Sequence, residues 1–474
     1  MPPLIATVVY IVLVLGLFWL DRDRKARTSA ALWIPVAWLL LACSRSVAQW
    51  LMVGQPIGPM PPADQYAMEG SPIDRIVYTG LLAIGLIVLA TRRQQIGRIL
   101  RANGPVLLFF GFCAMSLLWS DYPDVAFKRW SKALGDLVMV LVVVSDREPY
   151  AAVKRLLSWL TFLLIPISVL FIKYYPELGK GYGRWDYMPI YTGVTTNKNA
   201  LGAICLFLGG ASLWRFLSAY HEPKSASRKR LLLAHGVILG MVAWLFWMAN
   251  SMTALSCFLL GAIVMIGASS KAVFRKPVIV PILIAAMLLV SVGVLLLGQY
   301  PGILQTMGRN PTLTDRTEIW STILASAGNP WVGTGFESFW LGPRLQRIWS
   351  SFSWQPFEAH NGYLEIYLNL GWAGIALLAL VLATGYRTVM VAWRRKQPAS
   401  SLMLAYFVIA LIYNFTEAAF FRMMAPAWIF SLLAITAIPQ RSTVADRRLL
   451  RQLPTAPGRA KVAVSAAIVT EESG

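Results

Sequence analysis

Residues 360–390 read HNGYLEIYLNLGWAGIALLALVLATGYRTVM. From Tyr363 onward this stretch is almost entirely apolar. As a helix it would be about 42 Å long at 1.5 Å per residue, which exceeds the roughly 30 Å hydrocarbon core of a bilayer. The stretch therefore predicts a membrane-spanning helix, and it places His360 at the membrane boundary, immediately before that helix begins.

The rest of the chain contains twelve further apolar runs, at roughly 4–20, 31–53, 73–90, 105–119, 134–144, 157–172, 200–217, 231–249, 252–268, 278–298, 402–413 and 424–438. Because lipid offers backbone groups no hydrogen-bond partner, a chain crosses a bilayer only as helices or as a closed barrel, and runs of this length fit helices. The composition agrees, since 57% of the residues are hydrophobic and 14% are charged. The sequence predicts an all-α integral membrane protein, a polytopic bundle of 12–13 transmembrane helices. The short runs 134–144 and 402–413 leave the count open.

The basic residues indicate how this bundle is oriented. When the connections are assigned alternately to two sides, one side carries 28 Lys and Arg and the other 12. Basic loops stay in the cytoplasm, so the net charge of +21 reflects topology, and we expect no nucleic-acid partner. Loops 173–199 and 299–362 are then outside and the C-terminus is cytoplasmic. We expect a multi-pass protein of the cytoplasmic (inner) membrane.

Four parts make up the predicted domain organisation. Residues 1–298 form a transmembrane region of about ten helices that includes outer loop 173–199. Residues 299–362 form a large outer loop bearing short helices, and residues 363–438 form the C-terminal transmembrane helices. Residues 439–474 form a basic, disordered cytoplasmic tail near anionic headgroups. Because long ordered loops are usually functional, we expect the chemistry in the two outer loops.

Metal and cofactor chemistry is not indicated by any motif. The four cysteines, Cys43, Cys113, Cys205 and Cys257, all fall within apolar runs, where they are expected to be free and buried. The sequence has no P-loop, GxSxG or HExxH motif, and the outer loops have no DxD or HxH spacing. We therefore predict an enzyme without a metal ion or another cofactor.

The outer loop 173–199 combines glycines with Arg184, and Asn199 follows at the start of an apolar run. Glycines let the backbone approach a ligand closely, and Asn199 is a candidate helix N-cap, where free N–H groups favour an anion. The loop could therefore bind a diphosphate. The alternative is a turn-rich connector with an Asn cap and interfacial aromatic residues.

The second outer loop carries Arg316 four residues before Trp320. On a helix these two residues share a face, and arginine binds phosphate oxygens in a bidentate manner. The alternative is a local ion pair of Arg316 with Asp315 or Glu318 on a solvated helix. His360 is a candidate general base, because a neutral imidazole is the commonest protein base near neutral pH.

Polar residues within the apolar runs are costly in lipid, so each is a candidate functional residue. Glu417 and Arg422 lie on the predicted outer side with His360 and are secondary candidates. Arg45 and Asp136 are further examples. Snorkelling or interhelical pairing is the alternative explanation for this group.

Several segments together resemble a known family. They are GVTTNKNALG (193–202), NSMTAL (250–255), DRTEIW (315–320), GTGF (333–336) and HNGYLEIYLNLGWAGIALL (360–378). In this order they resemble the O-antigen ligase and O-antigen polymerase superfamily, closest to its exopolysaccharide-production polymerase branch. The resemblance covers about residues 184–382, and it implies a fold similar to the GT-C type lipid-dependent glycosyltransferases. Family members have twelve spans with both termini cytoplasmic, whereas thirteen runs are counted here.

The resemblance implies a metal-independent glycosyltransferase that acts on the periplasmic side of the membrane. The donor would be a glycan linked to polyprenyl (undecaprenyl) diphosphate, and the lipid bilayer would hold it. The residue matching the family's base is His360, and those matching its diphosphate-binding arginines are Arg316 and Arg184. A polymerase would use a second glycan as acceptor, and a chain-length regulator or other polysaccharide-assembly proteins would be its partners.

Three alternatives to a polymerase stay open. A ligase would transfer the glycan to lipid A core or to another acceptor, with the same donor and base. A transporter of lipid-linked glycan would need charged residues along a mid-membrane cavity. A non-catalytic scaffold would not need His360.

Overall fold

The computed structural model describes residues 1–23, 26–53, 70–182, 188–270, 314–352 and 354–438, with six single positions between 278 and 289. The side chains of residues 314–317 are outside this description. Residues 1–437 form one compact unit. Of the sequence predictions, Arg184, the tail 439–474 and most of the run 278–298 lie outside the described residues.

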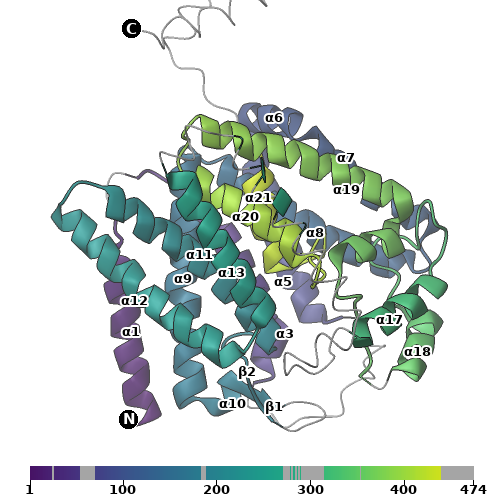
Figure 1. The fold of residues 1–474 in the computed structure, drawn as a ribbon, viewed down its shortest axis with the longest axis horizontal. Coiled ribbons are helices and arrows are strands. Elements are labelled where there is room, and N and C mark those ends of the chain that lie inside the picture. Colours follow the sequence, from purple (N-terminus) through teal and green to yellow (C-terminus); the bar gives the residue numbers. More distant parts are fainter. Residues whose placement is uncertain are drawn as a thin grey trace, which may run out of the picture. The chain divides into compact units, whose positions relative to one another are not determined.

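Helices make up nearly all of the described secondary structure (Figure 1). The N-terminal elements are α1 (Pro3–Leu20), η1 (Ala30–Leu32), α2 (Trp33–Ala42), α3 (Val47–Leu51), α5 (Pro72–Thr91), α6 (Arg93–Ala102), α7 (Gly104–Met115), η2 (Ser116–Trp119), α8 (Pro123–Val144) and α9 (Pro149–Tyr174). The central elements are α10 (Pro176–Gly179), the antiparallel strands β1 (Lys180–Tyr182) and β2 (Pro189–Tyr191), α11 (Lys198–His221), α12 (Ala226–Ala249) and α13 (Met252–Ser269). The C-terminal elements are α17 (Thr314–Ala325), α18 (Gly342–Ser351), α19 (Gly362–Arg394), α20 (Ser400–Tyr413) and α21 (Pro426–Ile435).

Seven of the described helices are long and apolar enough to cross a membrane, namely α1, α5, α9, α11, α12, α13 and α19. The segments Arg93–Ala102 and Gly104–Trp119 would add an eighth span if they count as one, although they meet at 87°. Shorter apolar helices run over Ala30–Ala42, α20 and α21. The predicted all-α polytopic fold is confirmed, while the count of 12–13 spans stays a prediction.

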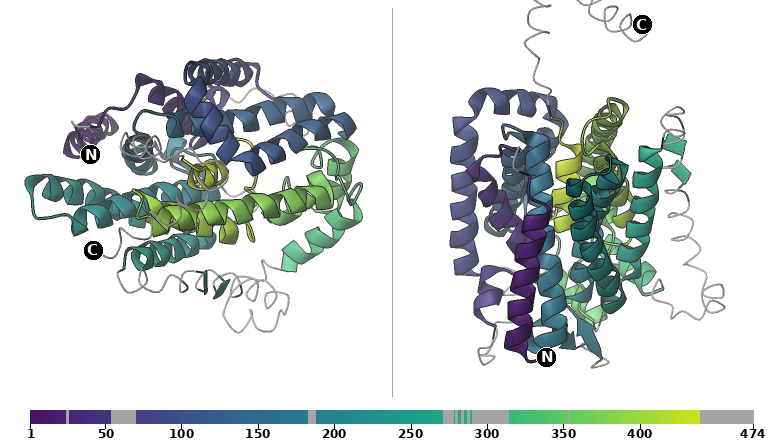
Figure 2. Two further views of the ribbon diagram at one scale, coloured as in Figure 1. Left: turned by 90° about the horizontal axis from the view of Figure 1, so that it is seen from above. Right: turned by 90° about the vertical axis from the view of Figure 1, so that its left-hand side faces the viewer.

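Helices α1 and α11 each pack against α9 and give this part of the bundle two distinct ends, whereas α19 runs at a steep angle to α1 (Figures 1 and 2). At the end that carries the β1–β2 hairpin, Thr7 near the start of α1 lies 2.7 Å from the hydroxyl of Tyr175, just beyond α9. At the opposite end, Arg215 of α11 donates to Asp21, just beyond α1, at 2.6 Å. α1 and α9 therefore run in opposite directions, whereas α1 and α11 run in the same direction.

The apolar run 363–390 forms two helical segments and not one, which corrects the expectation of a single continuous helix. The break is at Gly371, whose φ of 63° lies in the left-handed region. A Cβ built there would lie 2.3 Å from the carbonyl carbon of Trp331. The N–H groups of Trp372 and Ala373 donate to the carbonyls of Pro330 and Trp331 at 2.9 and 3.0 Å. The break thus docks the loop before α18 onto α19.

Candidate active site

His360 lies at the start of α19, where Asn361 caps the helix. The Asn361 side chain accepts hydrogen bonds from the N–H groups of Tyr363 and Leu364 at 3.0 and 3.1 Å, which satisfies two otherwise unpaired donors of the first turn. The φ of His360 is 48°, a left-handed value that is uncommon for a residue with a side chain and is found often at functional sites. The backbone thus turns sharply at His360 before the helix starts.

Two carboxylates face the same ring nitrogen of His360. Nδ1 lies 3.1 Å from Glu358 Oε1 and 3.7 Å from Glu417 Oε2, which is ion-pair distance, although neither contact is aligned as a hydrogen bond. The indole of Trp354 stacks on the imidazole with ring centres 6.0 Å apart. Nδ1 is buried, whereas the side chain is 24% exposed. Because carboxylates beside Nδ1 favour a proton there, Nε2 is left as the basic nitrogen.

Glu417 and Arg422 come from the connection between α20 and α21, and the structure brings both to the His360 region. Arg422 pairs with Glu358 through its guanidinium. The N–H of Gly362 donates to the carbonyl of Glu417 at 3.1 Å and to that of Asn414 at 2.8 Å. The connection is therefore fastened directly to the first residue of α19.

Buried polar side chains hold this connection in shape. Asn414 accepts hydrogen bonds from the N–H groups of Ala419 and Phe420, both at 2.9 Å. Asp136 of α8 accepts one from the N–H of Met424 at 2.9 Å and one from the indole of Trp38 at 2.7 Å. Asp136 therefore ties the connection to the bundle, which agrees with the interhelical-pair explanation and not with a catalytic role.

Glu365, in the first turns of α19, joins the backbone before His360 to the loop that follows GTGF. Its carboxylate accepts hydrogen bonds from the N–H of Ala359 at 2.6 Å, from the Trp340 indole at 2.9 and 3.0 Å, and from the Asn369 amide at 3.3 Å. The side-chain oxygen of Asn369 in turn accepts from the N–H groups of Ser338 and Phe339. Residues that are far apart in the sequence thus form one hydrogen-bonded unit.

An apolar core supports the site from α17 and α18, which lie at one edge of the bundle beside the start of α19 (Figure 1). This core contains Ile319, Phe339, Leu345 and Leu368 among its buried residues. The indole of Trp320 donates to the carbonyl of Ala359 at 2.8 Å. Arg316 lies one turn before Trp320 in α17, and its side chain is outside the described residues.

A cavity of about 140 Å³ lies beside the His360 cluster. Its polar lining consists of Arg129, Glu337, Trp340, Glu365, Asn369 and Arg422, and its apolar lining includes Phe336, Phe357, Phe420 and Phe421. Arg129 of α8 donates to the carbonyl of Glu337 and lies 3.8 Å from its carboxylate. The cavity therefore presents two arginines together with carboxylates, and it is too small for a whole oligosaccharide.

Two other sequence predictions concern Asn199 and the four cysteines. Asn199 is not the N-cap of α11, because the cap is Asn197, whose side chain accepts from the N–H of Ala200 at 2.9 Å. The reason is that α11 begins at Lys198, two residues before the apolar run, so Asn199 lies within its first turn. Among the described contacts, none joins Asn199 to His360. All four cysteines are free and buried, as predicted.

The sequence did not point to Arg129, Glu337, Glu358 or Glu365 as site residues. Glu365 lies within segment 360–378, four residues before Asn369. On a helix this spacing brings the two polar side chains together, which could have pointed to Glu365. Glu358, His360 and Glu417 also offer donor atoms that lie within 4.8 Å of one another, a spacing that suits a cation. The expected absence of a metal ion therefore stays a prediction.

Comparison with known proteins places this site in a family context. Residues 225–379 match the family model described as O-Antigen ligase. The resemblance to the O-antigen ligase family is confirmed. The match includes both His360 and Arg316, whereas Arg129 and Arg422 lie outside its bounds.

A curated protein to which this chain is similar is the exopolysaccharide production protein ExoQ of Rhizobium meliloti (strain 1021). It is 25% identical over 309 residues, which cover 59% of this chain and 64% of ExoQ. The match therefore spans less than two thirds of the length of ExoQ. With the seven apolar helices, these findings support a multi-pass membrane protein with similarity to this family.

Proposed function

We propose that the chain is a metal-independent glycosyltransferase that polymerises polyprenyl-diphosphate-linked oligosaccharide repeat units into exopolysaccharide. The reaction would take place at the outer face of the cytoplasmic membrane. The observation that carries this proposal is His360, whose Nδ1 lies between the carboxylates of Glu358 and Glu417. Similarity to a protein with a role in exopolysaccharide production supports the product class.

In the proposed reaction, Nε2 of His360 accepts the proton of an acceptor hydroxyl. The oxygen attacks the anomeric carbon of the donor, and the bond from that carbon to the diphosphate oxygen breaks. The lipid diphosphate leaves with the bonding electron pair, so the configuration at the anomeric carbon inverts. The carboxylates of Glu358 and Glu417 stabilise the imidazolium that forms, because opposite charges at this distance attract strongly where water is scarce.

The departing diphosphate needs positive charge in place of a metal ion. Arg316 and Arg184 are the proposed diphosphate ligands, on the strength of the family resemblance. Arg129 and Arg422 line the cavity beside His360 and supply further positive charge on the same side of the active site. Because each already contacts a carboxylate, substrate binding would exchange a carboxylate partner for a phosphate.

The deciding experiment uses the purified full-length protein in proteoliposomes with a synthetic polyprenyl-diphosphate oligosaccharide. Wild type should give a ladder of lengthened glycans, and His360→Ala should abolish it. The matched control is His221→Ala, because His221 is exposed at the other end of the bundle, at the end of α11. Unchanged ladder formation by His360→Ala would refute the assignment of the base.

A ligase is the second candidate, because the matching family model is described as O-Antigen ligase. It would transfer the glycan to lipid A core without lengthening it. Adding lipid A core to the same proteoliposomes separates the two reactions. Transfer to lipid A core without a ladder would favour the ligase and would leave the role of His360 intact.

A further inference from the structure

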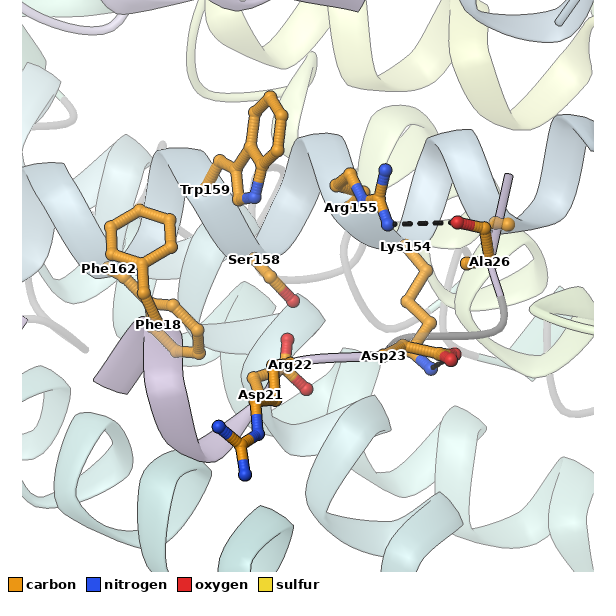
Figure 3. A pocket seen from close by; sticks show the side chains of 11 residues that line it. Phe18, Asp21, Arg22, Asp23, Ala26, Lys154, Arg155, Ser158, Trp159 and Phe162 are labelled. Carbon is orange, nitrogen blue, oxygen red and sulfur yellow. Dashed lines mark hydrogen bonds and ion pairs between the residues drawn. The ribbon is translucent and has the colours of Figure 1, made fainter. Parts of the chain in front are cut away.

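A second pocket lies away from His360, where α1 ends and α9 begins (Figure 3). It has a volume of about 230 Å³ and is lined by Arg22, Asp23, Lys154, Arg155 and Trp159 among others. We call it the basic pocket. Its lining residues come from the segment after α1, including Ala26, and from the first four turns of α9.

The length of α8 shows how far this pocket is from the active site. Arg129, near the start of α8, lines the active-site cavity. Asp146, just beyond the end of α8, accepts a hydrogen bond from the N–H of Ser29 at 3.1 Å, close to Ala26 in the sequence. The helix has 22 residues and is therefore about 33 Å long, close to the thickness of a bilayer core. The two pockets thus lie near opposite ends of α8.

The basic pocket has more positive than negative charge available to a ligand. Arg22, Lys154 and Arg155 line it together with two carboxylates, Asp21 and Asp23. The charge of Asp21 is neutralised by Arg215, which does not line this pocket and whose guanidinium lies 2.6 Å from the Asp21 carboxylate. Asp23 pairs with Lys154 at 3.2 Å, and both side chains stay partly exposed, at 41% and 27%. An anion would therefore meet a net positive site.

Aromatic residues place the basic pocket at the level of a membrane interface. Trp33 is 58% exposed and stacks on Trp159 with ring centres 4.3 Å apart. The guanidinium of Arg22 lies 4.6 Å from the ring centre of Trp19, which is 53% exposed. Tryptophans gather at the headgroup level of membranes. In the apolar helix α1, four residues spaced along one face are more than half exposed, namely Leu4, Val8, Val12 and Leu15, so this face is available to lipid chains.

We propose that the basic pocket binds the phosphate headgroup of an anionic glycerophospholipid whose acyl chains lie along α1. Arg22 and Lys154 contact the phosphate, while Arg155 shapes the wall by donating to the carbonyl of Ala26 at 3.2 Å. Basic pockets between helices at the cytoplasmic face are suited to such headgroups. A free phosphate would use the cations but would gain nothing from the exposed tryptophans and the apolar surface of α1.

The test measures phosphatidylglycerol binding to delipidated full-length protein by native mass spectrometry and by thermal shift. Phosphatidylcholine and inorganic phosphate are the comparison ligands. Wild type should prefer phosphatidylglycerol over both. Arg22→Gln/Lys154→Gln should weaken phosphatidylglycerol binding roughly thirtyfold, taking about a fivefold effect for each basic residue. Arg22→Gln alone should weaken phosphatidylglycerol binding about fivefold, in a protein that keeps the Lys154–Asp23 pair.

The matched control is Arg98→Gln/Arg101→Gln, which removes the same charge from exposed positions of α6. It should leave phosphatidylglycerol binding unchanged. Equal weakening in the control would show general surface attraction and overturn the pocket assignment. Unchanged binding in the Arg22/Lys154 variant would also overturn it. If inorganic phosphate competes as well as phosphatidylglycerol binds, the pocket is a soluble-anion site and the lipid assignment is wrong.

Discussion

Replacing Glu365 should show whether this residue only positions His360 or takes part in the reaction itself. Its carboxylate accepts from the N–H of Ala359, next to His360, and from the indole of Trp340, which lines the active-site cavity. Glu365→Ala removes both acceptors and leaves two partly buried donors unpaired. At roughly 1.5–3 kcal/mol for each hydrogen bond to a charged group, the loss is about 3–6 kcal/mol. Part of it should appear as a lower Tm, and displacement of His360 should lower kcat about 100-fold.

The conservative variant Glu365→Gln provides the control. Its remaining carbonyl, in the place of Oε1, can still accept from Ala359 and Trp340, so only the contacts of Oε2 with Trp340 and Asn369 are lost. We expect kcat within about tenfold of wild type and a Tm between those of wild type and Glu365→Ala. The kcat of each variant comes from glycan ladders quantified in proteoliposomes, and Tm is measured on the same preparations. If Glu365→Gln loses as much kcat as Glu365→Ala at a wild-type Tm, Glu365 acts in the chemistry and the positioning argument is refuted.

Four further predictions follow from other parts of the molecule. Arg316→Lys should lose most of its activity, because a point charge cannot bind the diphosphate in a bidentate manner; wild-type product length would contradict this role. Treatment with EDTA should leave ladder formation unchanged, and loss that Mg²⁺ or Zn²⁺ restores would refute metal independence. Gly371→Ala should cost at least about 1–3 kcal/mol in thermal unfolding, because φ is 63° and the new Cβ meets backbone; Gly240→Ala, with open space around the Cβ, is the control. Burial alone would raise the pKa of Asp21, but the nearby His235 and the charge of Arg215 lower it, so the stability that Asp21 contributes is present above about pH 4 and is lost as the pH falls further. Asp21→Asn should flatten the dependence of Tm on pH in that range, and an unchanged slope would contradict the assignment.

The position of His360 could be predicted because it depends on a local pattern. A long apolar run predicts a membrane-spanning helix, Asn361 is a recognisable cap for it, and α19 does begin directly after His360 and Asn361. The contacts of His360 could not be predicted in the same way. Its carboxylate partners come from the residue two positions earlier, through a left-handed turn at His360 itself, and from a connection more than fifty residues later. Neither leaves a periodic signal.

Arg129 shows a different limit of the sequence pattern. The apolar run 134–144 is too short for a span, whereas α8 begins at Pro123 and is 22 residues long. Its first three turns include Lys128, Arg129 and Lys132, so hydropathy alone treats them as a loop. These charges are tolerated in the helix because Arg129 points into the polar cavity, where it contacts Glu337. The charged residue that lines the cavity is thus the reason why the helix was hard to recognise.

The contacts around His360 suggest how donor binding could be coupled to the basicity of its imidazole. Arg422 engages Glu358, the carboxylate nearer to Nδ1, whereas Glu417 also faces Nδ1 from a backbone that is fastened to Gly362. If a phosphate takes Arg422 from Glu358, that carboxylate becomes fully available to the imidazole. Donor binding would then strengthen the base at the moment when the acceptor must lose its proton. Arg422→Gln should therefore raise the KM for the donor, because a phosphate-binding cation is lost, while kcat at saturating donor stays near the wild-type value, because Glu358 is then always available to the imidazole. An unchanged KM would contradict this coupling.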